Sequence, residues 1–379
     1  MEARPFYLIA HKCNSPAEVE KAIRDGANAV ECDLQYKQSK NVFVVNHDDV
    51  NNPEEYDLTT YLKEVKKNAA LALIIFDCKK SVAKKPQIAL DLLNTIKTEL
   101  PDETGINIII SVAKYENKDF FRDIIDKLEE KSGVAIDQED DPTILLNHFG
   151  SLEKNYCYAN GLSTDNDFVD WGATLLGFKE KLRRSIIQAL LHKVEYKIKL
   201  VYVWTLLDKN LMKSYLCMGV DGILVDSVTD LVEVLNDKEF KNSVKLATRN
   251  DNAFKLPLPS TYKIVVKTGD RKDAGTDANV YITLYGDRNS CEHLLNTSDD
   301  DFERGKEDEF LITTVADLGN LKQVRIKHDN SGLYSGWFLD WIKVEKDNQS
   351  WNFPCNRWLA SDEYDYKIDR TLEVNNAAL

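Results

Sequence analysis

The chain has 379 residues, of which 43% are hydrophobic and 30% are charged, a balance that is ordinary for a globular protein. Its formal net charge of −14 argues against a nucleic-acid partner and against purely electrostatic attraction to anionic lipid, because both need a concentrated basic face. No apolar run approaches the roughly 18 residues that a transmembrane helix needs. No secretion leader precedes the first strand-like run, so we expect a secreted chain in its mature form, or alternatively a cytoplasmic one.

The first predicted unit is a strand followed by a helix. Residues 6–11, FYLIAH, form an apolar run, and SPAEVEKAIRDGA follows. Ser15 is a good N-cap, Pro16 suits the first helical position, Glu18 completes a capping box and Gly26 suits the helix end. This pattern predicts one β/α unit.

Later apolar runs repeat this unit along the first two thirds of the chain. Strands are predicted at 28–34, 42–47, 71–77, 106–112, 143–148, 199–205 and 221–226, and helices at 88–100, 119–133 and 182–194. Runs without alternation are typical of strands buried on both faces of a parallel sheet. About eight such units in roughly 240 residues favour a (β/α)8 TIM barrel over an open sheet.

The pattern changes near residue 258. Two prolines stand close together there, and short alternating runs such as YKIVVKTG, NVYITLYG and FLDWIKV follow without a helical pattern. These runs predict an all-β sandwich. We therefore expect two domains, a barrel at 1–257 and a β-sandwich at 258–379.

The seven cysteines are scattered along the chain and have no CxxC spacing. This predicts neither a disulfide framework nor a zinc knuckle. The cysteines therefore leave the redox compartment open.

The run AVECDLQY raises the question of why two carboxylates lie inside a buried strand. Side chains two apart share one face of a strand, so Glu31 and Asp33 lie side by side. Two like charges in that position are costly unless a cation lies between them or one is protonated. Asp77 ends another apolar run, and three carboxylates offer the oxygen ligands that Mg²⁺ prefers. The alternative is a strand end whose acids face water.

Other polar side chains follow predicted strands, where the functional groups of a β/α barrel lie. His11 and His47 could serve as general base and general acid. Lys79 could contact a phosphate, and Trp204 offers a π face to a quaternary ammonium. Taken alone, each has an ordinary structural reading; together they indicate metal-assisted chemistry on a phosphodiester with a cationic leaving group. His148 is a weaker candidate for the same mouth.

The motifs HKCN, ECD, NHDD, IIFDCK, VYVWT and GVDGILVD resemble the spider-venom sphingomyelinase D family, a phospholipase D-type branch related to the glycerophosphodiester phosphodiesterases. ATRNDNAF, residues 247–254, resembles the segment that plugs the bottom of that family's barrel. The resemblance implies a phosphodiester lyase that uses a hydroxyl of its own phospholipid substrate to expel the headgroup and leave a cyclic phosphate. The implied residues are the Mg²⁺ ligands Glu31, Asp33 and Asp77, the acid/base pair His11 and His47, and the substrate contacts Lys79, Tyr202 and Trp204.

This chain departs from the family pattern at a few positions. WTLLDK is one residue longer than the usual WTVDK, which puts the role of Asp208 in doubt. Asp226 stands where the family has an asparagine, and the plug ends in Ala253 and Phe254 instead of Pro-Trp. The metal ligands are intact, whereas the choice between choline and ethanolamine stays open.

AGTDANVYITLYG and HDNSGLYSGWFLDWIKV resemble a PLAT domain, a β-sandwich that often carries membrane or protein contacts. The resemblance implies docking of the barrel at a membrane surface, where its phospholipid substrate lies. Ca²⁺ held by Asp277 and Asp329 is a candidate there, although turns in a sandwich are rich in aspartate anyway.

Two other functions stay open for the whole chain. One is a glycerophosphodiester phosphodiesterase that uses water as the nucleophile. The other is an inactive lipid-binding protein on the same fold. The position of Asp77, where the hydrolases more often have glutamate, and the plug segment favour the lyase.

Overall fold

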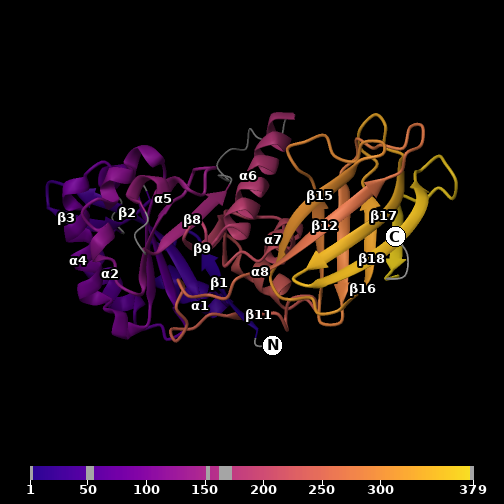
Figure 1. Ribbon diagram of the computed structural model, residues 1–379. Coiled ribbons are helices and arrows are strands. Elements are labelled where there is room, and N and C mark those ends of the chain that lie inside the picture. The colour runs from indigo at the N-terminus through magenta and orange to yellow at the C-terminus, as the bar shows by residue number, and fades with distance from the viewer. Residues whose placement is uncertain (1–2, 48–54, 151–153, 162–172, 376–379) are drawn as a thin grey trace. The chain divides into compact units, whose positions relative to one another are not determined.

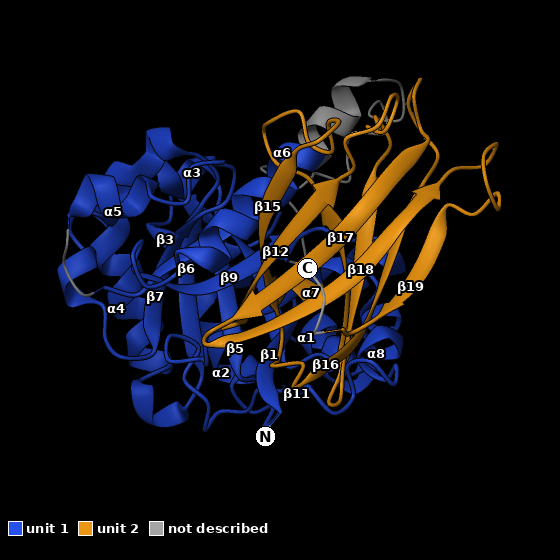
Figure 2. Cartoon of the chain, turned by 45° about the vertical axis from the view of Figure 1, so that its right-hand side comes forward, with its two compact units in different colours: residues 1–215, 220–258 blue, residues 216–219, 259–379 orange. Residues whose placement is uncertain are grey.

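The computed structural model describes residues 3–47, 55–150, 154–161 and 173–375. The chain divides into two compact units, one at 1–215 and 220–258 and the other at 216–219 and 259–379 (Figure 2). Figure 1 shows the helices and strands along the chain. Among the described residues, no helix is both long enough and apolar enough to cross a bilayer.

Unit 1 is a closed barrel of parallel strands. Each strand pairs in parallel with the next, and β1 pairs with both the second and the last strand, which closes the ring. The predicted TIM barrel is therefore confirmed. The ring strands are β1 (Arg4–Ala10), β2 (Ala29–Lys37), β5 (Leu73–Cys78), β6 (Asn107–Val112), β7 (Ser132–Ile136), β8 (Tyr156–Gly161), β9 (Ile198–Trp204) and β10 (Gly222–Val225).

Three further strands extend this sheet. β3 (Val42–Val45) runs antiparallel to β2, and β4 (Tyr56–Asp57) pairs with β3. β11 (Val244–Leu246) adds in parallel to β1. The run predicted at 42–47 is thus a strand, but it forms a hairpin with β2 outside the ring.

The helices of unit 1 surround the ring (Figure 2). In α1, Ser15 Oγ accepts from the backbone N–H of Glu18 at 3.2 Å, and Glu18 Oε2 accepts from that of Ser15 at 2.8 Å, which completes the predicted capping box. The helical segments are α1 (Pro16–Asp25), α2 (Leu58–Val65), α3 (Lys80–Ala83), α4 (Ala89–Glu99), α5 (Ile144–Phe149), α6 (Ala173–Leu191), α7 (Lys209–Met218) and α8 (Val228–Leu235), with the 3-10 turns η1 (Pro86–Ile88), η2 (Asp102–Thr104), η3 (Tyr115–Phe121) and η4 (Ile125–Lys127).

Two predicted elements are wrong. The run 143–148 forms helix α5 instead of a strand, because a short apolar run fits either element and Asp141 caps a turn just before it. The segment 119–133 contains the 3-10 turns η3 and η4 instead of an α-helix, and only its end joins β7. Strands β7 and β8, which the apolar pattern did not reveal, complete the ring.

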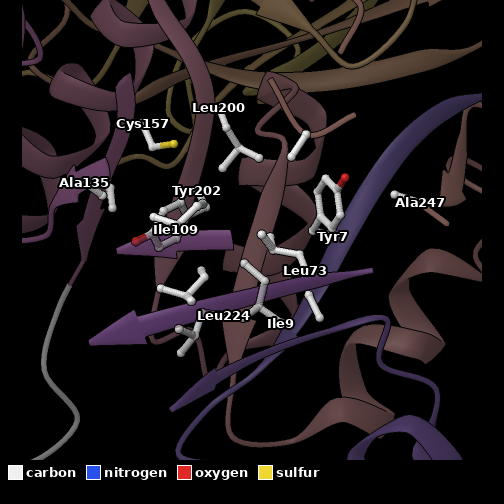
Figure 3. Close-up of a cluster of buried hydrophobic side chains, with 14 of the residues drawn as sticks. Tyr7, Ile9, Leu73, Ile109, Ala135, Cys157, Leu200, Tyr202, Leu224 and Ala247 are labelled. Atoms are coloured by element: carbon white, nitrogen blue, oxygen red, sulfur yellow. The ribbon is translucent and has the colours of Figure 1, made fainter. Parts of the chain in front are cut away.

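Inward-facing side chains of the ring strands fill the barrel (Figure 3). Segment 247–254 adds Ala253 and Phe254 to this core. Asn107, the first residue of β6, accepts from the Ala253 N–H at 3.0 Å, and the Arg249 guanidinium donates to the Asn68 carbonyl at 2.8 Å. These partners lie at or before strand starts, so the segment closes the N-terminal end of the barrel.

Unit 2 contains two four-stranded antiparallel sheets, which confirms the predicted all-β domain. One sheet has the order β15 (Glu307–Thr314), β12 (Ser260–Thr268), β17 (Trp337–Lys346) and β18 (Gln349–Leu359), and the other has β14 (Ser290–Leu295), β13 (Val280–Gly286), β16 (Leu321–His328) and β19 (Asp369–Glu373). Within this unit, Cys217 and Cys291 form a disulfide across 74 residues of sequence. The scattered spacing of the cysteines gave no signal for that bond.

Candidate active site

Three carboxylates meet at the C-terminal ends of two neighbouring strands. Glu31 and Asp33 lie on one face of β2, and the parallel register places Asp33 opposite Asp77 of β5. One oxygen from each of the three lies within 4.8 Å of the others. Asn14, in the loop after β1, fixes Asp33 by donating to its Oδ2 at 2.6 Å and accepting from its backbone N–H at 2.8 Å.

Charge in this cluster is only partly compensated. Burial, and then repulsion from Asp33 and Asp77, raise the pKa of Glu31 well above its usual range. Burial also raises the pKa of Asp77. The Lys79 ammonium lies 2.6 Å from Asp33 Oδ1 and also pairs with Asp77. Although burial opposes its charge, these two carboxylates raise the pKa of Lys79 above its ordinary value.

The donor set fits a hard divalent cation. Asp77 Oδ1 is buried and has no hydrogen-bond partner among the described residues. An orphaned carboxylate oxygen beside two further carboxylates is the environment that Mg²⁺ takes in proteins. Glu31, Asp33 and Asp77 would therefore hold the ion.

Both histidines border the same cluster. His11 follows β1; its Nδ1 lies 2.6 Å from Asp226 Oδ1, and its Nε2 lies 4.0 Å from Glu31 Oε2. His47 follows β3, and its carbonyl accepts from Gln35 Nε2 at 3.3 Å. The imidazoles thus approach from different strands, as two proton-transfer groups need to do.

An aromatic wall completes the site, built around a carboxylate that the sequence reasoning missed. Asp137 directly follows β7, and its Oδ1 accepts from the Tyr202 hydroxyl at 2.9 Å. Its carbonyl accepts from Trp204 Nε1 at 3.1 Å, and Ser111 donates to its Oδ2 at 2.6 Å. Burial, and then repulsion from Asp77, raise the pKa of Asp137 to about 7.

These groups share one cavity of about 470 Å³ at the C-terminal mouth of the barrel. Its lining includes His11, Glu31, His47, Asp77, Lys79, Asp137, Tyr202 and Trp204. The structure therefore brings together the predicted metal ligands, histidines and substrate contacts; Asp33 does not line the cavity but lies 2.6 Å from the Lys79 ammonium.

Other candidates lie elsewhere in the described part of the chain. His148 does not line the cavity and has its Nε2 3.9 Å from Asp119. Asp208 caps α7 by accepting from the Leu211 N–H at 2.9 Å, and it does not line the cavity.

The PLAT candidates Asp277 and Asp329 serve turns in unit 2. Asp277 accepts from the Tyr334 N–H at 3.3 Å, and Asp329 accepts from Ser331 and Asn279. Among the described residues, the acidic group with metal-binding spacing is the one in the barrel. Calcium binding by unit 2 stays a prediction.

Asp137 and Asp226 are two carboxylates at the candidate site that the sequence reasoning did not place. Asp137 was missed because β7 was not recognised as a strand. Asp226 was noted as a departure, but its contact with His11 depends on the pairing of β1 with β10. The signal that would have found Asp137 is a polar residue directly after the short apolar run VAI.

Comparisons with known proteins agree with both units. Residues 1–254 match the family model of the dermonecrotic toxin SPH, and residues 262–373 match the PLAT/LH2 domain. The dermonecrotic toxin LarSicTox-betaID1 of Loxosceles arizonica is 27% identical over 66% of this chain and 93% of its own length. The lipoxygenase homology domain-containing protein 1 of Mus musculus is 47% identical over 30% of this chain, which spans only 6% of that protein.

Among solved structures, a glycerophosphodiester phosphodiesterase from Parabacteroides distasonis covers 62% of this chain and 99% of its own, with 20% identity and a TM-score of 0.46. A likeness at this level carries no functional conclusion. The family model spans residues 1–254, which is most of the chain. The chain therefore belongs to the dermonecrotic toxin SPH family and carries a PLAT/LH2 domain after its barrel.

Proposed function

We propose that the protein is a Mg²⁺-dependent phospholipase D-type phosphodiester lyase. Its substrates are sphingomyelin, ceramide phosphoethanolamine or lysophospholipids, and its product is a cyclic phosphate. The observation that carries the proposal is the presence of His11 and His47 in one cavity with the carboxylates Glu31 and Asp77.

The two histidines would divide the proton transfers. His11 Nε2 takes the proton from a hydroxyl of the substrate, and that oxygen attacks the phosphorus. The bond from phosphorus to the headgroup oxygen breaks, and His47 donates a proton to the leaving alcohol. His11 gains one proton and His47 loses one, so proton exchange with solvent restores the starting protonation state of both histidines.

The charged groups beneath the histidines would stabilise the phosphoryl group. Glu31, Asp33 and Asp77 would hold Mg²⁺, which would supply positive charge against the phosphoryl oxygens. Lys79 adds a second positive charge at the same place, since it already lies between two of these carboxylates.

The aromatic wall would receive the headgroup. Trp204 offers a π face to a quaternary or primary ammonium. Asp137 lies on the same side and holds Tyr202 and Trp204 through hydrogen bonds. The aromatic face favours a cationic headgroup over neutral glycerol.

The test is product identification by ³¹P NMR. Sphingomyelin, ceramide phosphoethanolamine, lysophosphatidylcholine and a glycerophosphodiester are each incubated with the full chain, with and without chelator. We expect a cyclic phosphate that disappears with chelator. A linear phosphomonoester would instead indicate hydrolysis, and no turnover of any substrate would indicate a lipid-binding protein.

A matched pair of variants assigns the site. His11→Ala should abolish turnover without changing the unfolding midpoint. His192→Ala is the control, because His192 lies at the end of α6 and pairs with Glu195 at 2.9 Å. Equal activity of the two variants would refute the role given to His11.

The proposal extends to the compartment and to unit 2. A secreted chain is supported by the Cys217–Cys291 disulfide, because such bonds persist in oxidising environments. Unit 2 would dock the protein at a membrane or on a partner. Mass analysis of the protein purified from culture medium, before and after reduction, tests the disulfide; two free thiols at these positions would contradict secretion in this form.

A further inference from the structure

The mouth of the barrel carries an exposed basic rim. Lys80 and Lys84 flank the short helix α3 after β5, and Lys114 lies just after β6. All three line the active-site cavity and are exposed. Among the described residues, the exposed charged side chains that line this cavity are these three lysines, here called the lysine rim, and Glu116.

Unlike several other exposed lysines of the barrel, those of the lysine rim are not held by a carboxylate in the described part of the chain. Lys21 pairs with Asp25 at 2.5 Å, and Lys67 pairs with Glu64 at 2.6 Å. Within the described ranges, none of the ammonium groups of the lysine rim makes an ion pair with a carboxylate. Their charge is therefore available to an external anion.

An apolar side chain accompanies this charge at the same end of the barrel. Leu207 follows the cavity-lining Thr205 after β9, and 60% of its surface is exposed. Exposed lysines and an exposed leucine at the same end of a fold are a combination that binds to the surface of a charged bilayer.

We propose that the barrel mouth docks on an anionic lipid bilayer, with the lysine rim against acidic headgroups and Leu207 inserted among them. The inference rests on the proposed function, because a phospholipid in a bilayer reaches the cavity only when the mouth faces that bilayer. The net charge of −14 disfavours electrostatic attraction of the whole chain to such a bilayer, so docking depends on the local charge of the rim and on Leu207. At physiological salt, charges more than about 8 Å from the membrane are largely screened, so the local charge of the rim decides.

The experiment is vesicle sedimentation with the full chain and with chelator present, so that no lipid is turned over. Vesicles contain phosphatidylcholine alone or phosphatidylcholine mixed with phosphatidylglycerol. We expect preferential binding to the mixed vesicles that weakens as salt is raised. In Lys80→Glu/Lys84→Glu, affinity for these vesicles should fall by at least about tenfold, since each lysine near an anionic surface contributes about 1 kcal/mol.

The matched control is Lys238→Glu/Lys241→Glu, which changes the net charge equally. These lysines are exposed and lie between α8 and β11, at the opposite end of the barrel. The control should bind as the wild type does. Equal loss in both double variants, or equal binding of wild type to both vesicles, would overturn the proposal.

Further measurements distinguish a misfolded variant, an inactive enzyme and a binding partner other than a bilayer. If circular dichroism shows that the double variant misfolds, Lys114→Glu tests the lysine rim from a different loop. Binding requires no turnover, so an inactive protein that still prefers anionic vesicles supports the rim while refuting the lyase. Binding to soluble heparin by a protein that ignores both vesicles would overturn the bilayer as the partner.

Discussion

The imidazole Nδ1 of His11 lies 2.6 Å from Oδ1 of Asp226, although 215 residues separate them in sequence. The register of β1 and β10 pairs Ala10 with Val225, so the residues that follow each strand lie side by side. An ionised carboxylate only accepts hydrogen bonds, which places the hydrogen on Nδ1. Nε2 is then free to take a proton, on the side that faces Glu31.

Replacing Asp226 should therefore impair catalysis through His11. We expect Asp226→Ala to lower kcat by about tenfold to a hundredfold with little change in KM. Without the hydrogen bond to Asp226, the His11 imidazole is no longer fixed in orientation and is a less effective base. Asp226→Asn should keep most of the activity, since its amide oxygen can still accept from Nδ1–H. Steady-state kinetics check this, with Asp230→Asn as the surface control. Wild-type kcat in Asp226→Ala would contradict it.

The elements with strong local signals were predictable from the sequence. Ser15, Glu18 and Gly26 mark the ends of α1, and uninterrupted apolar runs mark most of the ring strands. Elements with weak local signals were not: β7 has a glycine and only three apolar residues, and α5 has a run that fits a strand equally well. A clear apolar run mattered more than length, because the four-residue strands β3 and β10 were predicted whereas the six-residue β8 was not.

The residues of the site likewise divide into those that local sequence patterns predict and those that they do not. Glu31 and Asp33 share a face because strand residues alternate, so their proximity was predictable. That Asp77 lies opposite Asp33 is a matter of register between β2 and β5, which no local pattern encodes. Asp137 was not predicted, because the strand before it, β7, was not recognised.

Removal of a metal ligand should abolish cation binding and the stability that it brings. At a Mg²⁺ concentration of about 100 times Kd, the wild type should gain about 2.7 kcal/mol in free energy of unfolding. In Asp77→Asn, the affinity should fall at least about a hundredfold, because loss of a ligand costs no less than loss of a supporting group. Calorimetric titration and thermal unfolding measure both effects. Asp208→Asn is the control, and equal Mg²⁺ stabilisation of Asp77→Asn would exclude the assigned ligand.

Asp137 should make the metal-free barrel less stable as pH rises. Burial raises its pKa to about 7 in the folded protein, whereas the ordinary value is 3.8. The folded state therefore holds the proton more tightly, and the stability present below about pH 4 is lost as pH rises through about 7. Relative to Asp137→Asn, we expect the wild type to lose on the order of 4 kcal/mol across this window and to change little above it.

Urea unfolding at several pH values in chelator measures this difference. Asp140→Asn is the control, because Asp140 is exposed and pairs with Lys181 at 2.5 Å. Parallel pH profiles for the wild type and Asp137→Asn would show that this carboxyl titrates normally.

A buried ionic group at the N-terminal end of β10 should govern the stability of the barrel. Asp221 is fully buried and lies 2.6 Å from both the Arg4 guanidinium and the Lys193 ammonium. Its Oδ2 also accepts from the Val201 N–H at 2.7 Å. Asp221→Asn leaves two buried cations without a counter-charge, which typically costs about 3–5 kcal/mol in free energy of unfolding.

Urea unfolding followed by helical circular dichroism measures this cost, because the helices belong mainly to the barrel. Asp25→Asn removes the partially exposed partner of Lys21 and should cost less than about 1 kcal/mol. The contrast between the variants follows from desolvation: Lys21 stays hydrated when its partner is lost, whereas Lys193, only 3% exposed, does not. Burial, and to a lesser extent the nearby Arg4, lower the pKa of Lys193. Asp221→Asn should therefore unfold more readily as pH falls, because this lysine must then take up its proton in a site without a counter-ion. Equal costs for the two variants would mean that Arg4 and Lys193 reach water when Asp221 is replaced.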